Sequence, residues 1–237
     1  MSEFSRSALL LGDDKIALLQ NARVAVFGVG GVGAACCEAL ARGGVGHLTL
    51  FDPDDVSLSN INRQFVALHS TLGQNKARVM RDRILDINPA AEVTVCPVFY
   101  NAENADQYPL DSFDFVADCI DTVTSKLLLI KNAHAANVPI ISALGAGNKM
   151  DPSRFRAADI YDTSVCPLAK VLRSKLRKMG VDHHRVVYST EEPMAPREVL
   201  SENGRHPPGS LSFVPPVMGM IMAGEILKTL CGLSSKG

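Results

Sequence analysis

The stretch Gly28-Val29-Gly30-Gly31-Val32-Gly33 decides the fold that the sequence predicts. It follows an apolar run of strand length, residues 23–27, and leads into a segment of helical period, residues 32–42. Glycines at this place let the backbone turn tightly and approach a phosphate, while the start of the helix offers unpaired N–H groups to the anion. A second apolar run, residues 47–51, ends in Asp52, whose carboxylate can accept hydrogen bonds from a ribose. Together these features predict a nucleotide-binding strand–helix–strand unit.

Strand-length apolar runs alternate with helical segments along the first part of the chain. We expect strands at 23–27, 47–51, 92–96, 115–119 and 139–142, and helices at 32–42, 75–87 and 124–137. No helix is expected between the third and fourth strands. This alternation predicts the α/β class: a doubly wound, Rossmann-like parallel sheet with helices on both faces, and a small C-terminal extension that completes the substrate side.

Two further regions lie outside this alternation. An amphipathic helix is expected before the first strand, with Asp13 as its N-cap and with Ile16, Leu18 and Leu19 available for burial. After Gly147 the chain is richer in charge, and a final helix is expected at 215–230. Between them, one face of a predicted helix is apolar and consists of Leu168, Val171, Leu172, Leu176 and Met179.

Composition excludes several classes of protein. The 237 residues are 46% hydrophobic with a net charge of −1, which excludes a disordered chain and leaves any RNA to be bound by a local basic patch. The apolar run 213–224 contains two prolines and stops at Glu225, short of the ~20 residues of a membrane span. The first residues lack the pattern of a secretory signal, so we expect a cytoplasmic protein. No two of the six cysteines are spaced C-x-x-C, which favours reduced thiols over a zinc site.

The segment after the second strand distinguishes ATP from NAD(P), which the glycine loop serves equally well. It reads Asp52-Pro53-Asp54-Asp55-Val56-Ser57-Leu58-Ser59-Asn60-Ile61-Asn62-Arg63-Gln64. Arg63 can neutralise phosphate charge, and Lys76, at the start of the next helix, can reach the same anion as a point charge. Asn60 can orient phosphate or ribose oxygens. A polar surface loop explains each of these residues singly, but it explains their combination less well.

A carboxylate pair follows the fourth strand, in Asp118-Cys119-Ile120-Asp121. Ligands of open α/β sheets bind at the carboxyl ends of the strands, so Asp121 is placed to hold Mg²⁺ on bound phosphates. The other interpretation of Asp121 is an N-cap for the helix that opens at Thr122. We expect a structural role for Asp118, and Gly145 and Gly147 border the substrate side of the crevice.

These linked motifs resemble the ubiquitin-activating-enzyme-like (ThiF-type) superfamily, whose bacterial members adenylate carboxylates with ATP. The resemblance implies one adenylation domain, with a nucleotide-binding core at 1–147 and a substrate and dimer portion at 148–237. It implies a homodimer in which Arg6, from the N-terminal segment, reaches the ATP of the other subunit. The implied catalytic residues are Arg63, Lys76, Asp121 and Arg6, with Asp121 at Mg²⁺. The implied ATP-binding residues are Gly28, Gly30, Gly31, Gly33, Asp52, Asp54, Asn60, Arg63, Gln64 and Lys76.

Within that superfamily the sequence is similar to the tRNA threonylcarbamoyladenosine dehydratases. The similarity rests on Phe4-Ser5-Arg6, Asn60-Ile61-Asn62-Arg63-Gln64, Ser164-Val165-Cys166-Pro167-Leu168-Ala169-Lys170 and Tyr188-Ser189-Thr190-Glu191. It implies ATP-dependent cyclisation of the threonylcarbamoyl group of the modified adenosine beside the anticodon of tRNA. Members that activate sulfur-carrier proteins usually carry two C-x-x-C zinc pairs, which this sequence lacks. An adenylyltransferase for the C-terminus of a ubiquitin-like sulfur carrier is the alternative, followed by an ATP-binding scaffold and a nicotinamide dehydrogenase.

Two features of the C-terminal portion stay open at this point. Cys166 is either a free thiol, which we favour, or an acceptor of sulfur from a sulfur-transfer protein. The predicted helix after it has a basic face that either binds tRNA phosphates or is simply solvated. This basic group consists of Lys170, Arg173, Arg177 and Lys178, followed by His183, His184 and Arg185.

Overall fold

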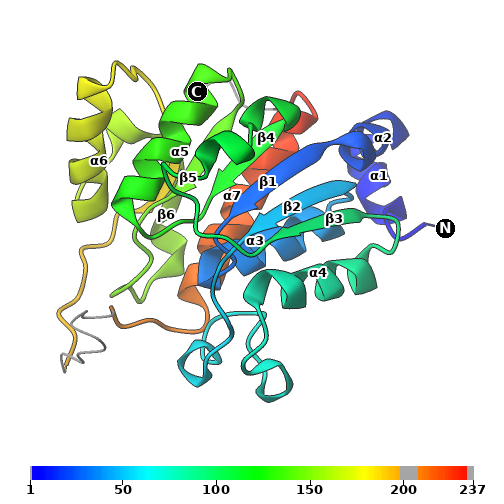
Figure 1. The fold of residues 1–237 in the computed structure, drawn as a ribbon, viewed down its shortest axis with the longest axis horizontal. Coiled ribbons are helices and arrows are strands. Elements are labelled where there is room, and N and C mark those ends of the chain that lie inside the picture. Colours follow the sequence, from blue (N-terminus) through cyan, green and yellow to red (C-terminus); the bar gives the residue numbers. More distant parts are fainter. Residues whose placement is uncertain (1, 198–207, 234–237) are drawn as a thin grey trace.

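The computed structural model describes residues 2–197 and 208–233 and confirms the predicted α/β class (Figure 1). One seven-stranded sheet has the order β3-β2-β1-β4-β5-β7-β6. All pairings are parallel except that of β6 with β7, which is antiparallel. The strands are β1 (Arg23–Phe27), β2 (His47–Phe51), β3 (Glu92–Cys96), β4 (Phe115–Asp118), β5 (Ile140–Ala143), β6 (Phe155–Asp159) and β7 (Arg185–Ser189).

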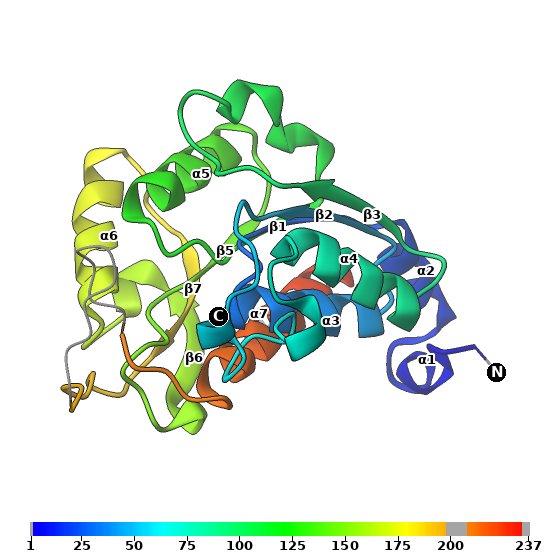
Figure 2. The ribbon, with the colours of Figure 1, turned by 60° about the horizontal axis from the view of Figure 1, so that its bottom comes forward.

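Helices cover both faces of the sheet (Figure 2), so its central strands are buried on both sides. On β1, Val24 and Val26 belong to one hydrophobic core, whereas Ala25 and Phe27 belong to the other. The first core lies under α3, α4 and α7, and the second lies under α5 and α6. The helices are α1 (Ser5–Leu11), α2 (Asp13–Asn21), α3 (Gly31–Arg42), α4 (Lys76–Ile87), α5 (Val123–Ala135), α6 (Pro167–Lys178) and α7 (Val214–Leu230).

The C-terminal helix α7 returns to the first half of the chain and packs along α3. Gly219 makes the close approach possible, because a Cβ added there would lie 2.2 Å from the carbonyl oxygen of Val32. Near the start of α7, Pro215 lies against Gly31 of the glycine loop. The C-terminal portion therefore supports the first turn of α3 directly. Strands from before and after residue 147 pair in one sheet. The division into a nucleotide-binding core and a substrate and dimer portion at that residue stays a prediction.

Several local expectations were wrong. The helix before β1 begins at Asp13 and is capped by Gly12, and Leu18 is half exposed. The buried face of α6 consists of Ala169, Leu172 and Leu176, whereas Val171 and Met179 are exposed. The sequence analysis did not identify α1, β6 or β7. Among the described residues, no helix has both the length and the apolar character needed to cross a bilayer.

Candidate active site

The glycine loop after β1 lies against the segment that follows β4. Gly28 has a φ of 89°, and a Cβ added to it would stand 2.8 Å from the carbonyl oxygen of Cys119. A Cβ at Gly33 would stand 1.8 Å from the carbonyl oxygen of Gly28, so no larger residue fits. No side chain caps the start of α3, where Gly30 is the N-cap. The free N–H groups of that first turn can therefore bind an anion.

The order of the strands places this loop at a crevice. β1 and β4 are neighbours, and the chain leaves β1 toward β2 on one side and leaves β4 toward β5 on the other. In open α/β sheets, ligands bind at the carboxyl ends of the strands where the strand order reverses in this way. The segments that follow β1, β2 and β4 carry most of the predicted site residues.

Asp52 fixes the geometry of the loop from the end of β2. Its Oδ2 accepts the N–H of Val29 at 2.6 Å, and its Oδ1 accepts the N–H of Asp54 at 2.9 Å. Burial raises the pKa of Asp52, whereas these two N–H groups and the charge of Lys76 oppose the rise. Each carboxylate oxygen has a second lone pair, so Asp52 can also accept hydrogen bonds from a ribose.

Asn60, Arg63 and Gln64 lie on the connection between β2 and α4. Asn60 is buried, and its Oδ1 accepts the N–H of Ser57 at 3.1 Å, which leaves the amide N–H groups for a ligand. Arg63 Nη1 donates to the carbonyl oxygen of Ser59 at 2.8 Å, which holds the guanidinium on its own loop. Gln64 is buried beside Gly30, and its Oε1 has no partner in the described part of the chain. An unpartnered buried amide indicates a site that a ligand would complete.

Lys76 is buried at the first position of α4 and reaches back toward the same loop. Its Nζ lies 2.8 Å from Asp54 Oδ2, and its backbone N–H donates to the carbonyl oxygen of Asp54 at 2.9 Å. Asn75 holds this arrangement, because its Nδ2 donates to the carbonyl oxygens of Asp52 and Asp54, each at 3.1 Å. The sequence analysis missed the role of Asn75, although a polar residue just before a predicted helix signals an N-cap.

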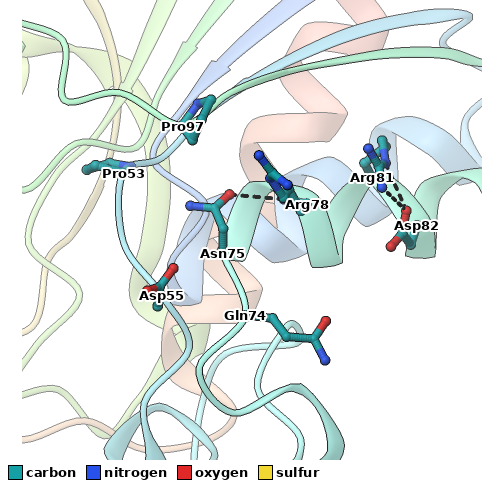
Figure 3. Close-up of a pocket in the computed structure, with 8 residues that line it drawn as sticks. All are labelled: Pro53, Asp55, Gln74, Asn75, Arg78, Arg81, Asp82 and Pro97. Carbon is teal, nitrogen blue, oxygen red and sulfur yellow. Dashed lines mark hydrogen bonds and ion pairs between the residues drawn. The ribbon is translucent and has the colours of Figure 1, made fainter.

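A cavity of about 530 Å³ borders this group on the side of α4 (Figure 3). Figure 3 shows Asn75 and Arg78, at the start of α4, near Pro53 and Pro97, whereas Arg81 lies beside Asp82 further along the helix. Arg81 is paired with Asp82 at 2.7 Å. The lining residues are Pro53, Asp55, Gln74, Asn75, Arg78, Arg81, Asp82 and Pro97.

Asp121 is exposed at the end of the segment that touches the glycine loop. Thr122 occupies the N-cap position of α5, and its hydroxyl donates to Asp121 Oδ1 at 3.3 Å. The N-cap interpretation of Asp121 is therefore wrong. Over the described ranges, no three His, Cys, Asp or Glu side chains are placed to hold a metal ion. A Mg²⁺ at Asp121 would take most of its ligands from phosphate oxygens and water, as is usual for this ion.

Arg6 is the one predicted site residue that the structure does not bring to the crevice of its own chain. It is exposed on α1, and its neighbour Phe4 packs against Gly44, just before β2 begins. Figure 1 shows α1 beside α2, at the amino-terminal end of β1 and opposite the glycine loop. Arg6 can therefore reach such a site only in another subunit.

The basic group after Cys166 is smaller than the sequence suggests. Arg173 Nη1 donates to the carbonyl oxygen of Thr163 at 2.9 Å, and the guanidinium of Arg177 lies 5.0 Å from the ring centre of Tyr161. His184 is buried, so its inclusion in the basic group was wrong. Arg185 is paired with Glu225 at 2.7 Å. The exposed members of the basic group are Lys170, Arg177, Lys178, His183 and Arg185, and their role in RNA binding stays a prediction.

Comparisons with known proteins identify relatives of this chain. The model of the ThiF family matches residues 4–236. The tRNA threonylcarbamoyladenosine dehydratase of Bacillus subtilis is 44% identical over 97% of this chain and 95% of its own length. The crystal structure of the Escherichia coli tRNA N6-threonylcarbamoyladenosine dehydratase in complex with AMP superposes with a TM-score of 0.89 at 34% identity, covering 99% of this chain and 96% of that one. Its complex with ATP gives a TM-score of 0.89 at 34% identity, covering 97% and 94%.

Proposed function

The chain belongs to the ThiF family, and from that premise we propose that it uses ATP to dehydrate threonylcarbamoyladenosine beside the anticodon of tRNA. One observation carries this proposal: the similarity to the tRNA dehydratases extends over nearly the whole chain, beyond the nucleotide motifs that all adenylating relatives share. The intact glycine loop, Asp52 and Lys76 supply the ATP-binding groups that such a reaction requires. ATP-bound and AMP-bound structures of the Escherichia coli relative support the choice of nucleotide.

The proposed nucleotide site uses groups that already converge. Asp52 would bind the ribose, and the N–H groups of the glycine loop and of α3 would bind phosphate oxygens. Asn60 and Gln64 would add amide donors. Arg63 and Lys76 would neutralise the charge that develops on the phosphates, with Lys76 exchanging Asp54 for a phosphate oxygen. The remaining members of the proposed site are Gly28, Gly30, Gly31 and Gly33.

The chemistry follows from the poor reactivity of a carboxylate. A carboxylate oxygen of the substrate attacks the α-phosphorus of ATP, and pyrophosphate leaves. A neighbouring nucleophilic atom of the same threonylcarbamoyl group then attacks the activated carbonyl carbon and loses its proton, and AMP departs with the former carboxylate oxygen. The ring closes with the net loss of water. The protein positions the two reactants and stabilises phosphate charge, and this scheme requires no protein nucleophile.

Mg²⁺ is the proposed metal cofactor. Asp121 is the carboxylate that would bind it, and the exposure of Asp121 supports a site completed by phosphate and water ligands. When bound, the ion would offset the negative charge of the phosphates. Asp121 would set its position relative to the glycine loop.

A homodimer is the proposed assembly. The helix α1, which carries Arg6, lies at the opposite edge of the sheet from the crevice, so the implied contact of Arg6 with ATP requires a second subunit. Leu9 and Leu10, on the same helix, are 85% and 89% exposed. Adjacent exposed leucines favour a surface that another protein covers.

A sulfur-transfer partner is a separate proposal that depends on Cys166. This thiol lies at the start of α6 and is buried, so sulfur transfer would require the end of the helix to open. Rapid modification of Cys166 by a thiol reagent in the folded protein would favour the partner. Protection of Cys166 until the protein unfolds would favour a structural thiol.

Lys76→Ala and Arg63→Ala test the proposed site. We expect each variant to reduce tRNA-dependent AMP release by about 100-fold or more, because each removes a cation that stabilises the transferring phosphate. Thermal unfolding should change little, since the side chain of Asp54, the partner of Lys76, is 66% exposed, so the loss of Lys76 leaves no buried carboxylate without a partner. Lys131→Ala, which removes an exposed cation on α5 outside the described cavity, is the control that should retain activity.

The substrate requirement in the same assay distinguishes the two enzyme functions. Pyrophosphate exchange that depends on tRNA carrying threonylcarbamoyladenosine supports the dehydratase. Exchange stimulated by a ubiquitin-like sulfur carrier, and not by tRNA, would favour the adenylyltransferase. Near-normal turnover in both Lys76→Ala and Arg63→Ala would contradict the phosphate assignment.

A further inference from the structure

A chain of buried polar side chains runs behind the candidate active site, and the proposed reaction does not use it. It consists of Asp118 at the end of β4, Lys126 on α5, Ser142 on β5 and His184 just before β7. The first three are completely buried, and His184 is 1% exposed. These four residues come from three elements and the segment before β7, and we call them the buried polar chain.

Hydrogen bonds join all four members. Asp118 Oδ2 accepts from Lys126 Nζ at 2.8 Å and from Ser142 Oγ at 2.5 Å. His184 Nε2 lies 2.8 Å from Ser142 Oγ. Because the hydroxyl proton of Ser142 is donated to Asp118, the Nε2–H of His184 donates to the hydroxyl oxygen. Along the buried polar chain, His184 therefore donates to Ser142 and Ser142 donates to Asp118, so the hydrogen bonds end at the Asp118 carboxylate.

The buried polar chain also holds two segments of backbone at the edge of the crevice. Asp118 Oδ1 accepts the N–H of Ile120 at 3.1 Å, which fixes the turn that leads to Asp121. The same turn lies against Gly28 and Gly33. Lys126 Nζ donates to the carbonyl oxygen of Ala143 at 3.0 Å, at the end of β5. The loop with Gly145 and Gly147, on the expected substrate side, begins just beyond it.

Stability alone does not explain a completely buried ion pair. Removing two charges from water is costly, and well-packed apolar side chains of similar volume often stabilise a fold as well or better. The sheet around Asp118 is apolar on both faces, so such a replacement is available. The Asp118–Lys126 pair also holds two backbone segments at the crevice through hydrogen bonds. Apolar side chains could not form these hydrogen bonds.

We propose that the buried polar chain positions Asp121 and the end of β5 for ATP and metal binding, with Asp118, Lys126 and Ser142 as positioning residues. The inference rests on the proposed function, because that function makes Asp121 a ligand of Mg²⁺. None of these three side chains reaches the crevice surface. They act through the N–H of Ile120 and the carbonyl oxygen of Ala143.

Ser142→Ala is the mildest test, because it removes one hydroxyl and leaves the ion pair intact. We expect the Mg²⁺ concentration for half-maximal AMP release to rise about tenfold, as happens when partners that orient a metal ligand are removed. The Kd for ATP, measured by calorimetric titration without turnover, should rise with it. A second variant, Asp118→Asn with Lys126→Met, removes both charges without leaving one unpaired and should show the same shifts.

Glu38→Gln is the matched control. Glu38 is also buried and pairs with Arg42 and Arg83, but it joins α3 to α4 away from the turn. It should lower the temperature of unfolding and leave the Mg²⁺ requirement unchanged. Wild-type Mg²⁺ and ATP dependence in both Ser142→Ala and the double variant, with only a lower unfolding temperature, would overturn the inference. The activity of Lys76→Ala tests the proposed ATP chemistry independently. A failure of the proposed function can therefore be distinguished from a failure of this inference.

Discussion

Gln64 shows how a single buried residue can indicate a ligand. The side chain is 8% exposed, and its Oε1 has no hydrogen-bond partner within the described residues. Leaving a buried amide oxygen unpaired costs about 1–3 kcal/mol. The sequence motif placed Gln64 in the ATP site, and the missing partner gives an independent reason for the same assignment.

We therefore predict opposite effects of Gln64→Leu on stability and on binding. The temperature of unfolding should stay the same or rise, because an unpaired polar group leaves the interior. The Kd for ATP should rise about tenfold, because leucine can neither donate to a phosphate oxygen, as Nε2 can, nor accept from a donor of ATP such as a ribose hydroxyl, as Oε1 can. Calorimetric titration and thermal unfolding measure the two effects. Gln20→Leu, exposed on α2, is the control. Equal ATP affinity in Gln64→Leu and wild type would remove Gln64 from the site.

His184 predicts how stability depends on pH. Burial lowers the pKa of His184 from 6.5 to about 3, with smaller contributions from His134, Lys126 and His183. Between these two pH values the unfolded chain binds more protons than the folded one, so the free energy of unfolding falls as the pH falls. At pH 5 this group alone should cost on the order of 2 kcal/mol relative to pH 7.

Urea unfolding at pH 7 and pH 5 measures that difference. His184→Gln retains an N–H donor for Ser142 but does not titrate, so the difference between the two pH values should shrink by the same amount. The pKa values of Glu38 and Glu225 are lowered below 4.5, so these carboxylates contribute only at still lower pH. A variant with the pH dependence of the wild type would show that His184 does not determine it.

At the scale of elements, the N-terminal turn of α3 depends on α7. Gly219→Val would place a branched side chain where even a Cβ lies 2.2 Å from the carbonyl oxygen of Val32. The two helices must then separate, which should destabilise the protein by about 2 kcal/mol or more and weaken ATP binding through the displaced glycine loop.

Gly224→Ala, on the same helix, has nothing within 4 Å of the added Cβ. It should stabilise the protein by up to about 1 kcal/mol with no change in ATP affinity. Thermal unfolding and calorimetric titration measure both variants, and equal effects would refute the packing argument.

The elements that the sequence predicted are those with a clear hydrophobic period. β1 to β5 are short apolar runs, and their order along the chain sufficed for a parallel sheet. β6 (Phe155–Asp159) contains one large apolar residue, and an edge strand of this kind gains its stability from pairing with β7 rather than from its own pattern. α1 was missed because Leu9 and Leu10 are exposed together, so the helix shows no amphipathic face within one chain. The pair of Asp118 with Lys126 joins a strand to a helix and has no signature in the sequence.

At the scale of the whole molecule, the proposed active site takes groups from two places that a single chain keeps apart. Lys76 begins α4, at the carboxyl edge of the sheet, whereas α1, which carries Arg6, lies at the opposite edge (Figure 1). If the proposed homodimer is correct, each active site combines Lys76 of one subunit with Arg6 of the other. Leu9 and Leu10, beside Arg6, would then be buried by the contact between subunits.

Mixing two inactive variants tests this arrangement. Arg6→Ala and Lys76→Ala should each be inactive alone, but in a mixed dimer one site carries both changes and the other carries neither. Equal mixing with subunit exchange makes half of the dimers mixed, so about a quarter of the wild-type activity should return. Arg63→Ala mixed with Lys76→Ala is the control and should restore nothing, because both residues serve the crevice of their own chain. Mass spectrometry of tagged subunits shows whether the subunits exchange. If they exchange and the first mixture regains no activity, a role for Arg6 across the dimer is contradicted.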